Sequence, residues 1–301
     1  MQFTYQETDK TRLDKFLQGQ LDISRSQIKK VILDGQVTVN GKISTVHHWL
    51  KNGDEILYKQ SASAPQETTF DVEPEIVRQT DDYLILEKPH GLLVHPTDKS
   101  ENNTLADWLV KYFPETAKIG DDPNRPAIVH RLDKEVSGLM VIPLNQESFD
   151  SLKKQFQNRT IKKEYTALVH GQLINDQGEV TTPLERDKKT GLMKVQSAKN
   201  SGKAAHTTYE VIKKFINYTL VHVKIKTGRM HQIRAHFYSI GHSIAGDKLY
   251  RTKDIRKKKK ILEQRIFLHA HFLKFKALDG QYHTYNSELP RELKDFLKTI
   301  K

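Results

Sequence analysis

A stretch of small and polar residues divides this chain into two parts of very different length. The sequence QSASAPQETTFDVEP, at positions 60–74, has two prolines and few large apolar side chains, whereas apolar runs occur on both sides of it. Such a composition is typical of a linker, because it offers no apolar face around which a core could form. We therefore predict a small N-terminal module at residues 1–59 and a second domain at residues 75–301, a length that a single domain can reach.

The N-terminal module is predicted to contain an amphipathic helix followed by a β-hairpin. The segment SRSQIKKVILDG, residues 24–35, begins with the spacing of a capping box, places its apolar residues on one helical face and ends at a glycine. The next segment, QVTVNGK at residues 36–42, alternates up to an Asn-Gly pair, which is a frequent hairpin turn. The module has nine basic and seven acidic residues, so its charge alone does not mark it as an RNA-binding unit.

The larger domain mixes strands and helices without regular alternation. Apolar and alternating runs predict strands at residues 83–89, 162–171 and 218–227. Helical periodicity predicts helices at residues 146–157 and 229–240. A doubly wound parallel sheet needs strands that are regularly separated by helices, so this order favours an α+β fold.

Composition restricts the partners and the compartment of the protein. The chain carries 49 Lys and Arg against 37 Asp and Glu, a net charge of +12, which favours a polyanion such as nucleic acid as partner, although the same charge could serve solubility alone. It has no cysteine, which excludes disulfides, thiolate metal sites and a cysteine nucleophile. Because we find neither a secretion signal nor an apolar stretch of bilayer length, we expect a cytoplasmic protein without a membrane partner.

The motifs of the common nucleotide-binding and hydrolytic enzymes are absent, and the histidines do not define a metal site. The sequence has no P-loop, dinucleotide fingerprint, serine-hydrolase elbow or zinc-protease motif. Among 14 histidines, the pairs His231 with His236 and His269 with His271 are candidate ligands, but neither has a third ligand at a recognisable spacing. We therefore expect structural or RNA-contacting roles for these side chains, and neither a metal nor a cofactor.

One acidic residue is held inside an otherwise apolar segment. In IVHRLDKEVSGLMVIPL, residues 128–144, Asp133 lies between Arg131 and Lys134, and Ser137-Gly138 is expected to form a turn before the chain re-enters the core. Burial alone would neutralise this carboxylate, whereas a neighbouring guanidinium would keep it charged, so a reactive aspartate here needs an arginine partner. From this segment alone, a structural Asp–Arg pair that closes a turn is the alternative.

Two ordered sets of motifs resemble known families. The N-terminal run TRLDKFL, SRSQIKKVILDGQVTVNGK and VHHWLKNGDEI, from Thr11 to Tyr58, resembles the S4 RNA-binding domain. The larger domain resembles the RluA family of pseudouridine synthases, which isomerise uridine in RNA. The motifs that carry this second resemblance are EKPHGLLVHP at 87–96, RPAIVHRLDKEVSGLMV at 125–141, KKEYTALVHG at 162–171, KTGRMHQIRAHF at 226–237, GHSIAGDKLY at 241–250 and FLHAHFLKF at 267–275.

The resemblance implies a role for each matching residue in the cleft. Asp133 would be the catalytic aspartate, and Arg234 would pair with it and hold it ionised. Tyr165 would stack on the base, close to the proton that is removed late in the reaction. Arg131 would enter the space left by a flipped uridine, and Leu268 would form part of the apolar wall of the pocket.

Further residues are expected to contact RNA. Arg229 and His231, at the start of the helix predicted at 229–240, would meet phosphate. In the S4-like module the expected phosphate contacts are Arg12, Arg25, Ser26 and Lys29. The basic run RTKDIRKKKK at 251–260 is either a loop that grips RNA or a solvated charge run.

The resemblance thus predicts an α+β protein in which a small S4-like α/β module precedes a catalytic domain with a mixed, mainly antiparallel sheet. The predicted activity is the conversion of specific uridines to pseudouridine in structured RNA, without ATP, redox cofactor or metal. Ribosomal RNA of the large subunit is the favoured substrate and transfer RNA the alternative, and no protein partner is indicated. The competing classes are a non-catalytic RNA-binding or ribosome-assembly factor and a metal-dependent hydrolase that uses the histidines.

Overall fold

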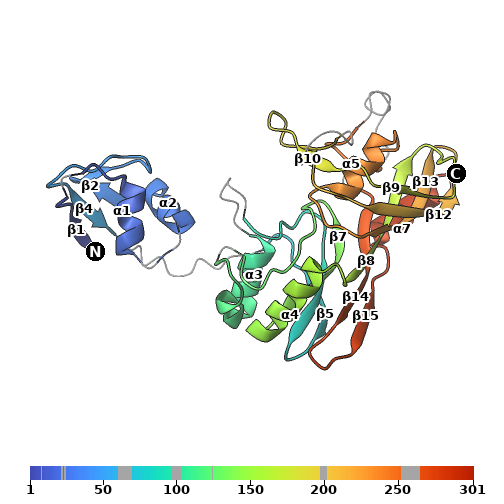
Figure 1. Cartoon of the computed structure of the whole chain (residues 1–301), viewed down its shortest axis with the longest axis horizontal. Helices are drawn as coiled ribbons and strands as arrows, with labels where there is room; N and C mark the ends of the chain where they lie inside the picture. The colour runs from blue at the N-terminus through green and yellow to red at the C-terminus, as the bar shows by residue number, and fades with distance from the viewer. Residues whose placement is uncertain are drawn as a thin grey trace. The chain divides into compact units, whose positions relative to one another are not determined.

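The chain divides into two units, and most of the first 69 residues belong to the smaller one (Figure 1). The computed structural model describes residues 1–7, 9–21, 23, 25–59, 70–96, 103–123, 125–196, 202–251 and 265–301, without the side chains of Arg25, Ser26 and Lys30. Within these residues, no helix is long and apolar enough to cross a membrane.

The N-terminal unit packs two helices on a four-stranded antiparallel sheet of order β1-β4-β2-β3. The predicted hairpin is present, with Asn40 and Gly41 at its turn. The predicted helix is also present, but the capping residue Ser24 lies outside the described residues. The elements are β1 (Gln2–Thr4), α1 (Leu13–Gln20), α2 (Arg25–Leu33), β2 (Val37–Val39), β3 (Lys42–Ile43) and β4 (Glu55–Tyr58).

The turn of this hairpin explains its sequence. Asn40 has a φ of 51° and Gly41 a φ of 75°, so both residues adopt the left-handed backbone conformation that asparagine and glycine tolerate best.

The core of the unit forms between the sheet and the two helices. Its fully buried members include Leu13 and Leu17 of α1, Ile28 and Ile32 of α2, and Ile56 of β4.

The larger unit is built on a nine-stranded sheet. Its strand order is β5-β6-β7-β14-β8-β13-β12-β9, and β15 pairs with the C-terminal half of β14. Among the described strands of this sheet, only β7 and β14 pair in parallel, so the predicted α+β fold with a mixed, mainly antiparallel sheet is confirmed. The strands are β5 (Glu75–Gln79), β6 (Tyr83–Lys88), β7 (Ser137–Pro143), β8 (Lys162–His170), β9 (Gln177–Val180), β12 (Thr207–Lys214), β13 (Tyr218–Ile225), β14 (Leu268–Lys276) and β15 (Tyr282–Asn286).

Helices cover both faces of this sheet. The apolar side chains of α3 and α5 join those of β6, β7, β8 and β13 in the main core. On the opposite face, α7 packs through Leu293 and Phe296 against Leu168 of β8 and Leu220 of β13. The remaining elements are α3 (Leu105–Tyr112), the 3-10 helix η1 (Pro114–Lys118), α4 (Gln146–Gln157), α5 (Gln232–Ser239), α7 (Arg291–Thr299), and a small hairpin of β10 (Leu184–Arg186) and β11 (Met193–Val195).

Two local predictions were wrong. Ser137 and Gly138 do not form a turn but begin β7, where they pair with His269 and Ala270 of β14. The glycine is required there because a Cβ on Gly138, at a φ of 129°, would lie 2.4 Å from the carbonyl oxygen of Ala270.

The helix predicted at 229–240 begins only at Gln232. His231 precedes it with a φ of 52°, which is left-handed and therefore incompatible with a helix that starts earlier. Arg229 and His231 consequently lie in the connection between β13 and α5, and this connection forms one side of the candidate site.

Candidate active site

Asp133 lies in the loop that leads into β7, and a buried lysine, Lys88, holds this loop through hydrogen bonds. Lys88, at the end of β6, is fully buried, and its Nζ donates hydrogen bonds to the carbonyl oxygens of Pro89 (2.8 Å), Leu92 (2.8 Å) and Lys134 (3.2 Å). Burial lowers the pKa of Lys88 to about 7. Because one of its three acceptors is the carbonyl next to Asp133, Lys88 holds the backbone of the predicted catalytic residue in place.

The structure brings Arg234 and Asp133 together across 101 positions of sequence. Nη1 of Arg234, on α5, donates to Oδ2 of Asp133 at 3.0 Å. Nε and Nη2 donate to the two carboxylate oxygens of Asp247 at 2.7 and 2.9 Å. Burial disfavours the Arg234 cation, but the two carboxylates outweigh this effect and raise its pKa above the ordinary value.

Asp247 is the residue of this group that the sequence did not single out. Its side chain is 0% exposed, and its Oδ1 also accepts hydrogen bonds from the backbone N–H groups of Leu249 (2.8 Å) and Tyr250 (3.0 Å). It follows Gly246, whose φ of 76° allows the chain to turn against the backbone of Arg265. The carboxylate is therefore rigidly held, and it fixes the orientation of the guanidinium that contacts Asp133.

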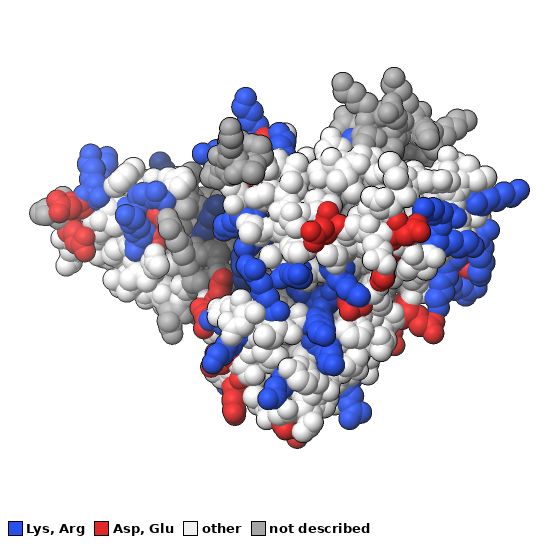
Figure 2. Space-filling model, turned by 45° about the vertical axis from the view of Figure 1, so that its right-hand side comes forward, with Lys and Arg blue, Asp and Glu red and all other residues white. Residues whose placement is uncertain are grey.

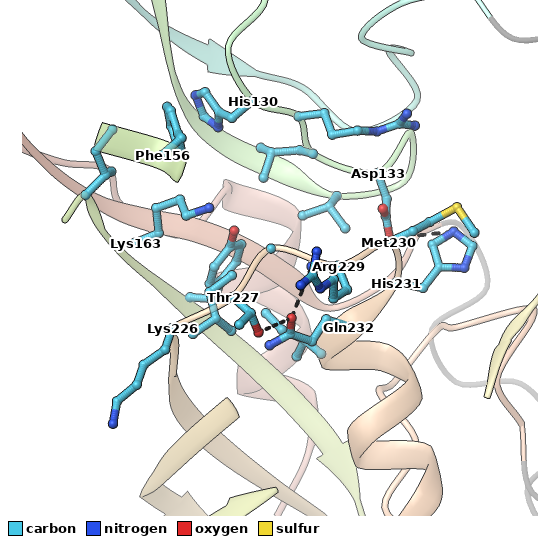
Figure 3. A pocket seen from close by; sticks show the side chains of 18 of the residues that line it. His130, Asp133, Phe156, Lys163, Lys226, Thr227, Arg229, Met230, His231 and Gln232 are labelled. Carbon is cyan, nitrogen blue, oxygen red and sulfur yellow. Dashed lines mark hydrogen bonds and ion pairs between the residues drawn. The ribbon is translucent and has the colours of Figure 1, made fainter. Parts of the chain in front are cut away.

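His231 approaches Asp133 from the connection before α5. Its Nε2 lies 3.9 Å from Oδ2 of Asp133 (Figure 3). Its Nδ1 lies 3.1 Å from the hydroxyl of Tyr250. The Tyr250 oxygen already accepts the N–H of Met193 at 2.8 Å, so its proton can be donated to Nδ1, which leaves the ring proton on Nε2. Burial lowers the pKa of His231, and the ring lines the cavity next to Asp133.

A cavity of about 410 Å³ opens beside Asp133 and Arg234. Tyr165 of β8 and Leu268 of β14 line it, and both are buried, so they provide an apolar wall. Burial raises the pKa of Tyr165, and the charge of Asp133 raises it further. The phenol is thus neutral near neutral pH, as a ring that contacts a base would need to be.

The opposite end of the cavity carries a cation that the sequence analysis did not select. Figure 3 shows Asp133 and His231 at one end of the site and Lys163, Phe156 and His130 at the other. Nζ of Lys163 lies 5.1 Å from the centre of the Phe156 ring, and burial lowers the pKa of this lysine to about 8. Its position two residues before Tyr165 on β8 was the available signal, because alternate residues of a strand share a face.

Arg131 and Arg229 also border this cavity. Nη1 of Arg131 donates to Nε2 of His95 at 2.8 Å, so Nε2 is unprotonated and Nδ1 donates to the carbonyl oxygen of Pro96 at 3.0 Å. Burial and the Arg131 charge both lower the pKa of His95, which agrees with this neutral form. Arg229 is half-buried, and its Nε donates to the carbonyl oxygen of Ala204 at 3.2 Å.

The connection that carries Arg229 is organised by the first residue of α5. Oε1 of Gln232 accepts the hydroxyl of Thr227 (2.7 Å) and the backbone N–H of Arg229 (3.1 Å), as the dashed lines in Figure 3 show. Its Nε2 donates to the carbonyl oxygen of His206 and to the hydroxyl of Thr207, each at 3.0 Å. This glutamine thereby ties α5 to β12 and sets the position from which Arg234 reaches Asp133.

The predicted RNA contacts of the N-terminal unit are only partly described. Arg12 makes a bidentate ion pair with Asp14, at 2.9 and 2.7 Å, and Lys29 is exposed. The side chains of Arg25 and Ser26 lie outside the described part of the chain. In the larger unit, Arg251 is described, but the rest of the basic run, residues 252–260, is not.

Comparison with known proteins agrees with this architecture. A family model described as RNA pseudouridylate synthase matches residues 82–239, and a model of the S4 domain matches residues 11–56. The uncharacterized RNA pseudouridine synthase YlyB of Bacillus subtilis is 33% identical over 98% of this chain and 96% of its own length. Ribosomal large subunit pseudouridine synthase D of Nitrosomonas europaea is 36% identical over 79% of this chain and 68% of its own.

Solved structures show the same fold. The structure of human RNA pseudouridylate synthase domain containing 1 covers 74% of this chain and 87% of its own, with a TM-score of 0.61 and 22% sequence identity. The fold and the matches thus define an RNA-modifying isomerase that converts uridine to pseudouridine. The chain belongs to the RNA pseudouridine synthase family, in its RluA branch, and carries an S4 domain at its N-terminus.

Proposed function

We propose that this enzyme isomerises specific uridines of large-subunit ribosomal RNA, and that Asp133 is its catalytic residue. The observation that carries the proposal is the chain of contacts from Asp247 through Arg234 to Asp133 at the edge of the cavity. This chain of contacts holds the Asp133 carboxylate beside the space that a nucleotide would occupy, where it can attack or deprotonate.

The isomerisation breaks the bond between N1 of uracil and C1′ of the ribose, turns the base and joins C5 to C1′. The C5 proton leaves, and a proton is returned to the base, so the atoms balance without a co-reactant. In the proposed arrangement Asp133 acts on the nucleotide while the ring of Tyr165 and the side chain of Leu268 hold the base. Lys163, at the far end of the cavity, contacts an oxygen atom of the bound nucleotide.

Arg131 would fill the space of the flipped base within the RNA. It is exposed at the border of the cavity, and its contact with His95 holds it there in the absence of RNA. When RNA binds, the Arg131 side chain would leave His95 and move into the RNA. Arg229 and the S4 residues Arg12, Arg25, Ser26 and Lys29 are proposed to contact phosphate.

The surface charge and the relatives favour an RNA substrate of this kind. Figure 2 shows lysine and arginine side chains gathered across the middle of the larger unit, where acidic side chains are fewer. Several relatives that match this chain at 32–36% identity are named ribosomal large subunit pseudouridine synthase D. Transfer RNA is the alternative substrate that the same chemistry could accept.

The test is tritium release from C5-labelled RNA, measured in EDTA on unmodified large-subunit ribosomal RNA and on transfer RNA in separate reactions. We expect release from the ribosomal RNA, none with Asp133→Asn, and normal release with Asp279→Asn, which changes an exposed aspartate. Asp133→Asn should still bind RNA. Release from transfer RNA alone would contradict the proposed ribosomal RNA substrate. Full activity of Asp133→Asn would contradict the proposal that Asp133 is the catalytic residue.

A further inference from the structure

A cluster of two histidines and a glutamate lies on the face of the central sheet that is opposite to the cavity. Glu164 is on β8, His222 on β13 and His271 on β14, which are three neighbouring strands with β8 in the middle. Because alternate residues of a strand point to opposite faces, Glu164 points away from the cavity that its neighbour Tyr165 lines. The cluster is therefore separate from the residues that act on uridine.

The three side chains converge. One candidate ligand atom from each of them lies within 4.8 Å of the other two, and Nε2 of His222 is 2.6 Å from Oε2 of Glu164. The rings of His222 and His271 are 5.2 Å apart. Within the part of the chain that the structure describes, this is the one group of three or more histidine and acidic side chains with such spacing.

Polar groups lie close to Nδ1 of both imidazoles. Nδ1 of His271 lies 3.1 Å from Oγ1 of Thr166, which leaves Nε2 of this ring as a ligand atom, and Nδ1 of His222 lies 3.9 Å from Oε2 of Glu210. Nε2–H of His222 donates to Oε2 of Glu164, and a bound metal ion would displace this proton. Histidines that bind metals are held in the same manner by hydroxyl, carboxylate or carbonyl groups on their second nitrogen.

The donor set and its surroundings suit a transition-metal ion. Two imidazoles and one carboxylate are a common ligand set for Zn²⁺ when the fourth position is left to water. All three side chains are partly exposed, and His222 and Glu210 also line a surface hollow of about 390 Å³, which provides a path of entry.

We propose that Glu164, His222 and His271 form a binding site for a divalent transition-metal ion such as Zn²⁺, on the non-catalytic face of the sheet. Tetrahedral coordination with bonds of about 2.0–2.1 Å places ligand atoms roughly 3.3 Å apart, so the contact between Glu164 and His222 has to lengthen by a side-chain rotation. The bound ion would cross-link β8 to both of its neighbours. It would stabilise the folded state without taking part in the isomerisation.

The experiment is a calorimetric titration of the full chain, free of any histidine tag, with ZnCl₂, and a parallel titration with Co²⁺ read by visible absorption. We expect one ion per chain with micromolar affinity, and binding at least about tenfold weaker in Glu164→Gln and in His271→Gln. His206→Gln is the matched control, because His206 also pairs with a glutamate, Glu179 at 3.0 Å, but among the described residues belongs to no group of three converging histidine and acidic side chains.

Two further readouts keep the test decisive. Zinc should raise the melting temperature of the wild type and of His206→Gln, but not that of Glu164→Gln, an isosteric variant that retains activity in EDTA. If the wild type binds no ion at the micromolar level, the cluster is only a hydrogen-bonded pair with a neighbouring histidine, and the proposal is wrong. It is equally wrong if His206→Gln weakens binding as much as the cluster variants do.

Discussion

The substitution Asp247→Asn tests whether the position of Asp133, the proposed catalytic residue, depends on a side chain that does not line the cavity. Asp247 accepts two hydrogen bonds from Arg234, whose third bond goes to Asp133. Asparagine has nearly the same shape but no charge. Its NH₂ group would face either the guanidinium or the backbone N–H groups that now donate to the carboxylate, so donor would meet donor.

The expected loss of stability follows from burial. The side chains of Arg234 and Asp247 are 4% and 0% exposed, and removing one partner of such a buried pair costs about 3–5 kcal/mol of unfolding free energy. At about 2–4 °C per kcal/mol, the melting temperature should fall by roughly 6–20 °C. A displaced Arg234 would also release Asp133, and a misplacement of this kind lowers kcat by about 100-fold.

The assay combines thermal unfolding with tritium release at saturating RNA, and Asp295→Asn serves as control. Asp295 pairs with Lys298 at 2.7 Å, but these side chains are 50% and 75% exposed, so this variant should be nearly as stable as the wild type. The reasoning would be refuted if Asp247→Asn and Asp295→Asn were equally stable. A variant that lost stability but kept its kcat would show that Arg234 holds Asp133 without Asp247.

Three further outcomes follow from the packing and the charges. Gly138→Ala should cost about 3 kcal/mol or more of unfolding free energy in a denaturant titration, since its Cβ would overlap the backbone of Ala270. Gly280→Ala, at a φ of 77° and with open space around it, should cost about 1 kcal/mol. Burial lowers the pKa of His130 to about 3. As the pH falls from 6.5 to 5, this histidine therefore becomes protonated in the unfolded chain but stays neutral in the folded chain. The free energy of unfolding should fall by about 1–2 kcal/mol over this range, and by less in His130→Gln. Lys88→Met should leave carbonyl groups unsatisfied, lower stability by about 1–3 kcal/mol and reduce kcat, while an unchanged kcat would argue against its role in holding the loop.

Local sequence patterns correctly predicted the helices and strands in which apolar and polar residues alternate with a regular period. The strands at 83–88, 162–170 and 218–225 and the helix at 146–157 lie within one or two residues of their predicted bounds. The pattern failed where a distant segment decides the conformation. Ser137-Gly138 is typical of a turn, and nothing nearby in the sequence shows that β14 approaches this glycine closely.

In the candidate site, too, single residues could be selected from local sequence, but contacts between distant segments could not. Asp133 could be selected because a charged residue stands out within an apolar segment, but its pairing with Arg234, 101 positions away, could be expected only from the family resemblance. Asp247 lies in a motif that was noted, yet an aspartate after a glycine is common in turns, so its contact with Arg234 carried no local signal. Glu164, His222 and His271 come from three strands whose order in the sheet the sequence does not reveal.

The place of β14 in the sheet has a consequence for the synthesis of the protein. This strand lies between β7 and β8, but its last residue follows the end of β8 by about a hundred positions. At an elongation rate of about 5–20 residues per second, a ribosome needs roughly 5–20 s to cover that distance. During this interval the nascent chain carries two strands with unpaired edges, which are open to aggregation and to chaperones. The N-terminal unit can fold before its partner has been translated, whereas the catalytic sheet closes only when one of the last strands arrives at its centre.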